Sequence, residues 1–162
     1  MSHRVRQADV DDIAALVRLR RVMFEAMGNN DSDALDAMCQ ASERYFSERI
    51  PAERFFAWLA EDGGQAVASI GLVVHSIPPS PDRLDDREAY IMSLVTLPSY
   101  RRRGIAAELL ECALVFAREQ GIGVASLHAT SAGRGVYARA GFSERCEIPE
   151  MSVRLFRESG SA

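Results

Sequence analysis

The most constraining feature of the sequence is an apolar run that ends near a proline and leads, through three arginines and a glycine, into a helical pattern. The run AYIMSLVT (Ala89 to Thr96) predicts a strand buried on both faces, and Pro98 ends it because proline cannot donate to a sheet ladder. From Gly104, apolar residues recur at steps of four, three and four, which predicts an amphipathic helix ending near Gly121. A buried strand followed by such a helix indicates an α/β fold.

The rest of the chain supplies strands and helices around this unit. Before it we expect a strand from His3 to Ala8, a helix capped by Asp9 and Asp12, one or two short helices after residue 29, and a hairpin turning at Asp62-Gly63-Gly64. After it we expect a strand over 124–129, a shorter helix within 131–142 and closing strands around Pro149. This order predicts a mixed sheet with helices on its faces, in a single domain over residues 1–162.

Composition limits the classes of function. No apolar run approaches the roughly 20 residues that span a bilayer, and the N-terminal residues lack an apolar signal core, so we expect a soluble, cytoplasmic protein without a membrane partner. The three cysteines are widely spaced without a CxxC pair, which favours neither a disulfide framework nor a metal site. The net charge of −4 disfavours a nucleic-acid partner, although one local basic site can hold a small anion.

The junction between the central strand and its helix has the properties of such an anion site. A helix start offers N–H groups without intrahelical acceptors and carries a partial positive charge. A glycine there lets phosphate oxygens approach the backbone closely, and the small Ala106 leaves the approach open. The arginines at 101–103 add long-range attraction for an anion.

At this junction the chain resembles the GNAT superfamily of acetyl-CoA-dependent N-acetyltransferases, whose motif is [QR]-x-x-G-x-[GA]. Arg101, Gly104 and Ala106 stand at its defined positions. The resemblance implies a mostly antiparallel sheet that is splayed between its fourth and fifth strands. It also implies that N–H groups from Arg102 to Ala106 cradle the coenzyme A pyrophosphate. The coenzyme-binding residues implied at this motif are Arg101, Arg102, Arg103, Gly104, Ile105, Ala106 and Ala107.

The strand and a later segment extend the resemblance. On the bulged end of the strand, Leu94, Val95 and Thr96 are implied to pair through their backbones with the pantetheine arm. The segment LHATSAGRGVYARAGF is similar to the family's later strand and helix, and it places Tyr137 at the tyrosine that protonates the departing thiolate. A phenol with a pKa of about 10 can donate to a thiolate whose conjugate acid has a pKa of about 8.5. Thr130, where the family often has asparagine, is counted with the coenzyme-binding residues.

An amine acceptor is protonated at neutral pH and must lose a proton before it attacks a thioester. The candidate bases are Glu88, Tyr90 and His128, and Tyr90 stands where the family sometimes has a glutamate. Acidic residues also gather in two loops, which hints at a cationic acceptor; they are Asp31, Asp33 and Asp36, and Asp82, Asp85, Asp86 and Glu88.

The resemblance therefore implies an N-acetyltransferase that moves the acetyl group of acetyl-CoA to a primary amine of a small molecule or peptide. The attack is direct, with the oxyanion held by backbone N–H groups near Val95 and without a metal. The alternative is a GNAT-fold module that binds an acyl-CoA for regulation without turnover. The sequence leaves open the acceptor, the base, the use of longer acyl chains and whether the protein is a homodimer.

Overall fold

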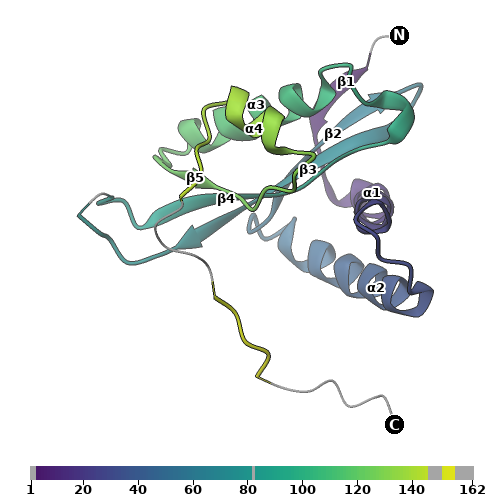
Figure 1. Ribbon diagram of the computed structural model, residues 1–162, viewed down its shortest axis with the longest axis horizontal. Coiled ribbons are helices and arrows are strands. Elements are labelled where there is room, and N and C mark those ends of the chain that lie inside the picture. Colours follow the sequence, from purple (N-terminus) through teal and green to yellow (C-terminus); the bar gives the residue numbers. More distant parts are fainter. Residues whose placement is uncertain (1–2, 82, 146–150, 156–162) are drawn as a thin grey trace.

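The computed structural model describes residues 3–81, 83–145 and 151–155, which build a twisted five-stranded sheet with helices on both faces (Figure 1). The strands follow one another in sequence order across the sheet, and the first four are antiparallel to their neighbours, whereas the fifth pairs in parallel with the fourth. The mixed, mostly antiparallel α/β fold expected from the sequence is confirmed. The strands are β1 (Arg4–Gln7), β2 (Phe56–Asp62), β3 (Gln65–Ser76), β4 (Arg87–Thr96) and β5 (Ala125–Ser126).

Helices α1 and α2 cover one face of the sheet, and α3 and α4 lie on the other (Figure 1). The reciprocal hydrogen bonds of Asp9 and Asp12 form the expected capping box before the first helix. The segment expected to hold one or two short helices is a single helix of 18 residues, because Asp31 caps it and Leu35, Ser42 and Phe46 form a buried stripe along it. The helices are η1 (Val10–Asp12), α1 (Ile13–Ala26), α2 (Ser32–Arg49), η2 (Pro98–Tyr100), α3 (Ile105–Glu119) and α4 (Arg134–Arg139).

Strand β4 is the element that positions the candidate site. Ala89 and Ile91 are buried in the apolar cluster under α3, and Val95 is buried in the cluster under α1 and α2. Tyr90 is only half-buried, so the expectation of a strand covered on both faces is wrong at this end of β4. The physical reason is that α1 and α2 cover the other end of the strand and leave this part of the sheet uncovered (Figure 1).

Two irregularities of β4 open the sheet. The register with β3 shifts between Ser69 and Gly71, and Ser93 opposite this shift has a left-handed backbone with φ of 54°, which together make a β-bulge. On its other edge β4 pairs with β5 only at Ala89 and Tyr90 among the described residues. The two strands therefore separate after Tyr90, which is the expected splay.

The chain after α3 departs from the sequence-based expectation. The strand expected over 124–129 contains only Ala125 and Ser126, because β4 diverges and offers no further ladder partner in the described part of the chain. Of the closing strands expected around Pro149, residues 143–145 and 151–155 are not in strand conformation, and the rest of that expectation lies outside the described residues. None of the described helices combines the length and the hydropathy needed to cross a membrane.

Candidate active site

The turn between η2 and α3 presents backbone N–H groups on an open surface. Arg102 and Gly104 have left-handed backbones, with φ of 61° and 82°. The first intrahelical bond is donated by Glu108 to the Gly104 carbonyl over 3.1 Å, and within the described residues the N–H groups of 102–107 find no protein acceptor. A Cβ atom built on Gly104 meets nothing within 4 Å, so the space beside this glycine is open. The arrangement suits a phosphate group.

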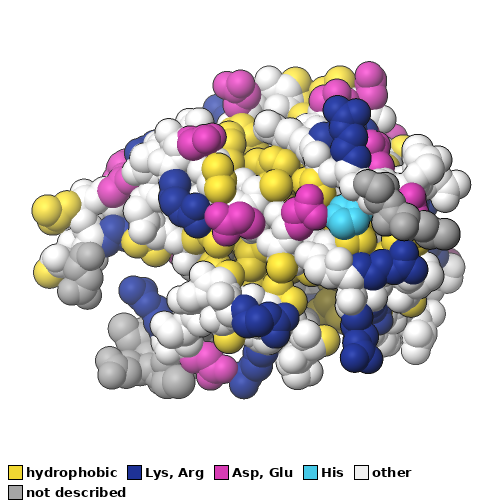
Figure 2. All heavy atoms as spheres, turned by 90° about the horizontal axis from the view of Figure 1, so that it is seen from above, with side chains coloured by type: hydrophobic (Ala, Val, Ile, Leu, Met, Phe, Trp, Pro, Cys, Tyr) yellow, Lys and Arg dark blue, Asp and Glu magenta, His cyan; other side chains and the backbone are white. Residues whose placement is uncertain are grey.

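The arginines of this turn chiefly hold the loop together. Arg101 Nε donates to the Thr96 carbonyl at 3.1 Å, and Arg103 donates to the Ser99 carbonyl at 2.8 Å. The Arg103 guanidinium also lies over the Tyr100 ring, 4.9 Å from its centroid. Arg101 therefore ties the end of β4, with Leu94, Val95 and Thr96, to the start of α3. The turn therefore presents mainly backbone N–H groups that have no protein acceptor among the described residues. Figure 2 looks onto the face covered by α3 and α4, where acidic, basic and apolar side chains are interspersed rather than gathered into one basic area.

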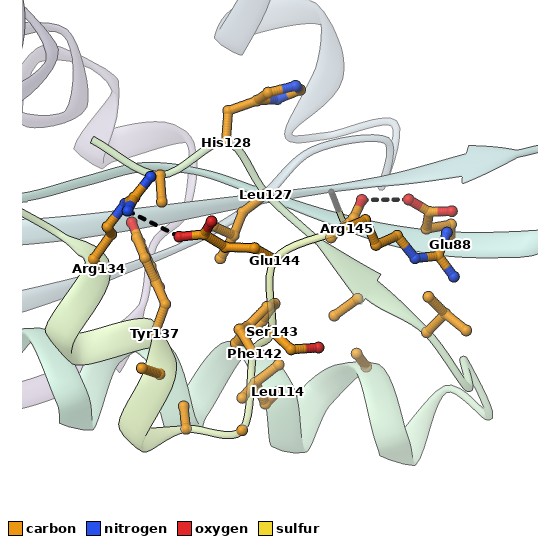
Figure 3. Close-up of a pocket in the computed structure, with 18 of the residues that line it drawn as sticks. Glu88, Leu114, Leu127, His128, Arg134, Tyr137, Phe142, Ser143, Glu144 and Arg145 are labelled. Carbon is orange, nitrogen blue, oxygen red and sulfur yellow. Dashed lines mark hydrogen bonds and ion pairs between the residues drawn. The ribbon is translucent and has the colours of Figure 1, made fainter. Parts of the chain in front are cut away.

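Tyr137 on α4 lines a cavity of about 1160 Å³ between β5, α3 and α4. Its ring packs edge-on against Phe142 with centroids 6.0 Å apart, and a Cβ on Gly133 would lie only 2.8 Å from its Cε2. Burial raises the pKa of the Tyr137 phenol. Its hydroxyl end points into the cavity (Figure 3). Thr130 accepts a hydrogen bond from the Gly133 N–H through its backbone carbonyl at 3.0 Å, which fixes the turn that leads into α4.

Two of the three candidate bases, Glu88 and Tyr90, lie on β4, and His128 follows β5; the three have different partners. Glu88 accepts a hydrogen bond from the Ser126 hydroxyl and pairs with Arg83 at 3.5 Å. The Tyr90 hydroxyl lies 2.6 Å from His128 Nδ1. The His128 ring points away from the side of β5 on which Tyr137 lies (Figure 3). The carboxylate is thus engaged within the sheet, whereas tyrosine and histidine form a pair.

The pair belongs to a wider aromatic group on β3, β4 and the segment after β5. The His75 ring stacks on the Tyr90 ring with centroids 5.3 Å apart and an interplanar angle of 9°. His75 on β3 is therefore part of the surroundings of the candidate base Tyr90.

Comparison with known proteins identifies the family of this chain. The model of the acetyltransferase (GNAT) family matches residues 14–142. The chain belongs to the GNAT acetyltransferase family. The match includes the η2–α3 turn and Tyr137, so both motifs identified in the sequence lie within the family's region.

Solved GNAT structures are similar over almost the whole chain. A GCN5-related N-acetyltransferase from Ralstonia eutropha JMP134 is 36% identical with a TM-score of 0.83, over 93% of this chain and 99% of that one. A predicted acetyltransferase from Clostridium acetobutylicum, solved with acetyl-CoA, is 28% identical with a TM-score of 0.84, over 93% and 96%. N-acetyltransferase 8 of Rattus norvegicus is 33% identical over 84 residues, which cover 52% of this chain and only 34% of the rat protein.

Of the carboxylates expected in two loops, Asp33 and Asp36 lie in α2 and Glu88 lies in β4, and most of the set are engaged within the protein. Asp31 caps α2 through the Ala34 N–H, Asp36 pairs with Arg21, and Asp85 accepts from the Arg87 N–H. Asp86 accepts from the Ser76 hydroxyl, and Asp82 lies outside the described residues. These groups therefore give little support to the expectation of a cationic acceptor. Among the described residues, no group of three or more His, Cys, Asp or Glu side chains has a geometry that could hold a metal ion.

Arg20 on α1 was not identified from the sequence. Its Nη1 donates to the Ser93 hydroxyl at the β4 bulge over 2.6 Å, and its guanidinium lies over the Phe24 ring, 5.0 Å from the centroid. The sequence does contain a signal for it: Leu16 and Leu19 are the buried residues of α1, and position 20 falls on the same helical face. A charged residue on an otherwise apolar stripe indicates a specific role for that charge.

Proposed function

We propose that this GNAT protein is an acetyl-CoA-dependent N-acetyltransferase that acts on a primary amine of a small molecule or peptide. The observation that carries the proposal is the set of N–H groups at 102–107, which lack protein acceptors among the described residues and lie next to the open edge of β4. Such a start of a helix binds anions through its backbone dipoles. In a GNAT chain the fitting anion is the pyrophosphate of coenzyme A.

The residues around the bulge fit the remainder of the donor. Gly104 leaves space for phosphate oxygens, and Arg101 holds the turn in place. Leu94, Val95 and Thr96 would align the pantetheine arm along the β4 edge, and N–H groups near Val95 would stabilise the oxyanion. The thioester of the coenzyme supplies the acetyl group, and these residues of the protein would hold the thioester in place for the attack. Thr130 would support this site through the turn before α4.

Tyr137 is proposed as the acid that protonates the departing thiolate. Because burial raises its pKa, the phenol stays protonated at neutral pH. A coenzyme thiol has a pKa of about 8.5, so proton transfer from tyrosine in the transition state is chemically matched to the step. Burial, together with Glu108 and Glu111, raises the pKa of the Cys112 thiol, which favours direct attack by the amine over an acyl-cysteine route.

Tyr90 and His128 are proposed as the groups that receive the amine's proton, directly or through ordered water. The amine nitrogen would give a proton to the Tyr90 oxygen while the Tyr90 hydroxyl proton passes to His128 Nδ1, which leaves an imidazolium. The separation of 2.6 Å is short enough for this transfer. Glu88 would hold β5 in place through Ser126 and contribute its negative charge to the same sheet face.

A second candidate is a GNAT-fold module that binds an acyl-CoA without turnover. The observation that favours it is the engagement of the Glu88 carboxylate by Ser126 and Arg83, which leaves the reaction without a carboxylate base at that position. Thiol release with any primary amine separates the two functions, because only the enzyme frees coenzyme A in an amine-dependent manner.

The test begins with thermal unfolding in the presence of coenzyme A and continues with a thiol-release screen against primary amines. A ligand at about 100 times its Kd stabilises the native state by roughly 2.7 kcal/mol, so a rise in Tm is expected. Unchanged Tm at saturating coenzyme A would exclude the donor assignment. A rise in Tm without thiol release from any amine would favour the binding module.

A further inference from the structure

The side chain of Arg20 contacts β4, the strand that carries the residues of the proposed function. Arg20 extends from the sheet-facing side of α1 to the bulge of β4 and donates to Ser93, which directly precedes the strand residues proposed for the pantetheine arm. Tyr90 is three positions before Ser93 on the same strand, or about 10 Å at the usual strand rise. The guanidinium therefore contacts β4 at a residue that lies, along the strand, between Tyr90 and the residues proposed for the pantetheine arm.

This cation lacks a carboxylate partner among the described residues. The Ser93 hydroxyl takes one of its N–H donors and Phe24 covers its flat side. Burial lowers the pKa of Arg20, an effect that Tyr45 partly opposes. Withdrawing a cation from water without a counter-charge costs free energy, which a bound anion recovers.

Other arginines of the chain are balanced differently. Arg21, the next residue on α1, pairs with Glu25 and Asp36, and Arg6 is held between Asp12 and Glu61. These carboxylates raise the pKa values of both arginines. Carboxylates on α1 and on nearby elements therefore pair with Arg6 and Arg21. Arg20 has no such partner among the described residues.

We propose that Arg20 binds a carboxylate of the acceptor, so that the acetylated amine belongs to an amino acid or to another small molecule with a carboxylate beside its amine. The inference rests on the proposed function and specifies its substrate class. A guanidinium presents parallel N–H donors that match the two oxygens of a carboxylate. In an α-amino acid a single carbon separates the carboxylate from the amine, so a carboxylate held at the bulge brings the nucleophile to the thioester.

The experiment compares matched acceptors with saturating acetyl-CoA and thiol release as the readout. For each of the proteinogenic amino acids, three compounds are tested: the free amino acid, its carboxamide and the amine that lacks the carboxyl group, with aminophosphonate analogues as a fourth set. At least one amino acid is expected to exceed its carboxamide and its decarboxylated amine by about 30-fold or more in kcat/KM, the size of effect associated with a desolvated charge pair.

Variants assign this preference to Arg20. Arg20→Gln is expected to raise the KM of the preferred amino acid by about 30-fold and to leave the KM of acetyl-CoA within about 2-fold, whereas Arg20→Lys retains part of the preference. Arg18→Gln is the matched control, since Arg18 lies on the same helix, is exposed and donates to the Ala66 carbonyl. It is expected to change neither KM. Should Arg20→Gln fail to fold, Arg20→Lys assigns the preference in its place, through a partial loss for the amino acid alone.

Each other outcome overturns the inference. Carboxamides, simple amines or aminophosphonates that serve as well as the amino acids would show that no carboxylate is recognised, while the acetyltransferase assignment would stand. A rise in the KM of acetyl-CoA in Arg20→Gln would place Arg20 at the donor instead. No thiol release with any amine, together with unchanged Tm in coenzyme A, would remove the proposed function and this inference with it.

Discussion

The two sides of the β4 bulge place their polar groups in different ways. On the α3 side, the donors are backbone N–H groups, and Arg101 and Arg103 donate to carbonyls of their own loop. On the α1 side, the polar groups are side chains brought together from distant segments: Arg20 with Ser93, and Tyr90 with His128. A backbone site depends on a local conformation that a short motif specifies. A side-chain site depends on how separate elements pack, which suits it to distinguish one acceptor from another.

The largest expected effect tests whether backbone N–H groups on the α3 side bind coenzyme A. Gly104→Leu places a side chain in the space over the N–H groups and is expected to weaken coenzyme A binding by about 100-fold, as for two lost charge-assisted hydrogen bonds. Gly28→Leu is the matched control, because Gly28 also has a positive φ and an open Cβ position. Both variants should lose about 1–2 kcal/mol of stability, but only Gly104→Leu should lose affinity by calorimetric titration. Equal affinity in both variants would contradict the backbone site.

The next effect concerns chemistry on the same side. Tyr137→Phe removes the proposed proton donor and is expected to lower kcat by about 10- to 100-fold, with the KM of acetyl-CoA nearly unchanged. Tyr100→Phe serves as the control, because it keeps the ring that lies under Arg103 and removes a hydroxyl that interacts with Asp62 and does not line the cavity of Tyr137. Single-turnover kinetics measures the chemical step directly. A single-turnover rate that is unaltered in Tyr137→Phe would take this residue out of the mechanism.

Tyr90→Phe removes the hydroxyl of a candidate base on the α1 side of the bulge. Loss of the contact with His128 Nδ1 is expected to lower kcat by about 10-fold and to move the acidic limb of the pH–rate profile, since the proton acceptor has changed. Tyr45→Phe, whose ring packs against Phe46 and Phe55 elsewhere on this face, should leave the profile in place. A lower rate without any movement of the profile would indicate a purely structural role for Tyr90.

A smaller effect tests how tightly α4 positions its acid. Gly133→Ala forces the Tyr137 ring to move, because the added Cβ would lie 2.8 Å from Cε2. We expect kcat to fall by about 5- to 10-fold, in keeping with the sensitivity of catalysis to misplacement of this size. Gly135→Ala on the same helix meets only the end of the Arg139 side chain, at 3.3 Å, and should keep full activity. If both variants were equally active, the placement of Tyr137 would not limit the rate.

The smallest expected effect is on coenzyme A affinity, and it compares the Arg102 side chain with the backbone N–H groups of the same turn. Arg102→Gln removes an exposed charge but no N–H group, so coenzyme A affinity should fall by only about 2- to 5-fold, in line with the modest energy of exposed ion pairs. The loss should shrink further at high salt, because ions screen exposed charges. A larger loss than that of Gly104→Leu would reverse the comparison.

The sequence predicted the features that are encoded locally. The start of α3 at Gly104, the amphipathic spacing of this helix and the capping box at Asp9 each depend on a few adjacent residues. Tyr137 was singled out by the resemblance to the GNAT family, from a motif on one short helix. Its role and those of the other site residues stay predictions until the variants are measured.

Features that depend on packing between distant segments were not predicted. Neither the engagement of Glu88 by Ser126 and Arg83 nor the shortness of β5 follows from any local pattern, because each is set by where β4 and β5 separate. Arg20 was missed because a lone charge on a helix is usually solvated, and only the approach of α1 to the bulge gives it a function.

The separation of β4 from β5 also has a consequence for the free protein. Beyond Tyr90, one side of β4 has no strand partner among the described residues. Strand edges without a partner pair readily with other chains. If the pantetheine arm lies there, the donor substitutes for a missing strand, and saturation with coenzyme A should slow amide exchange at residues 94–96 and reduce self-association on storage.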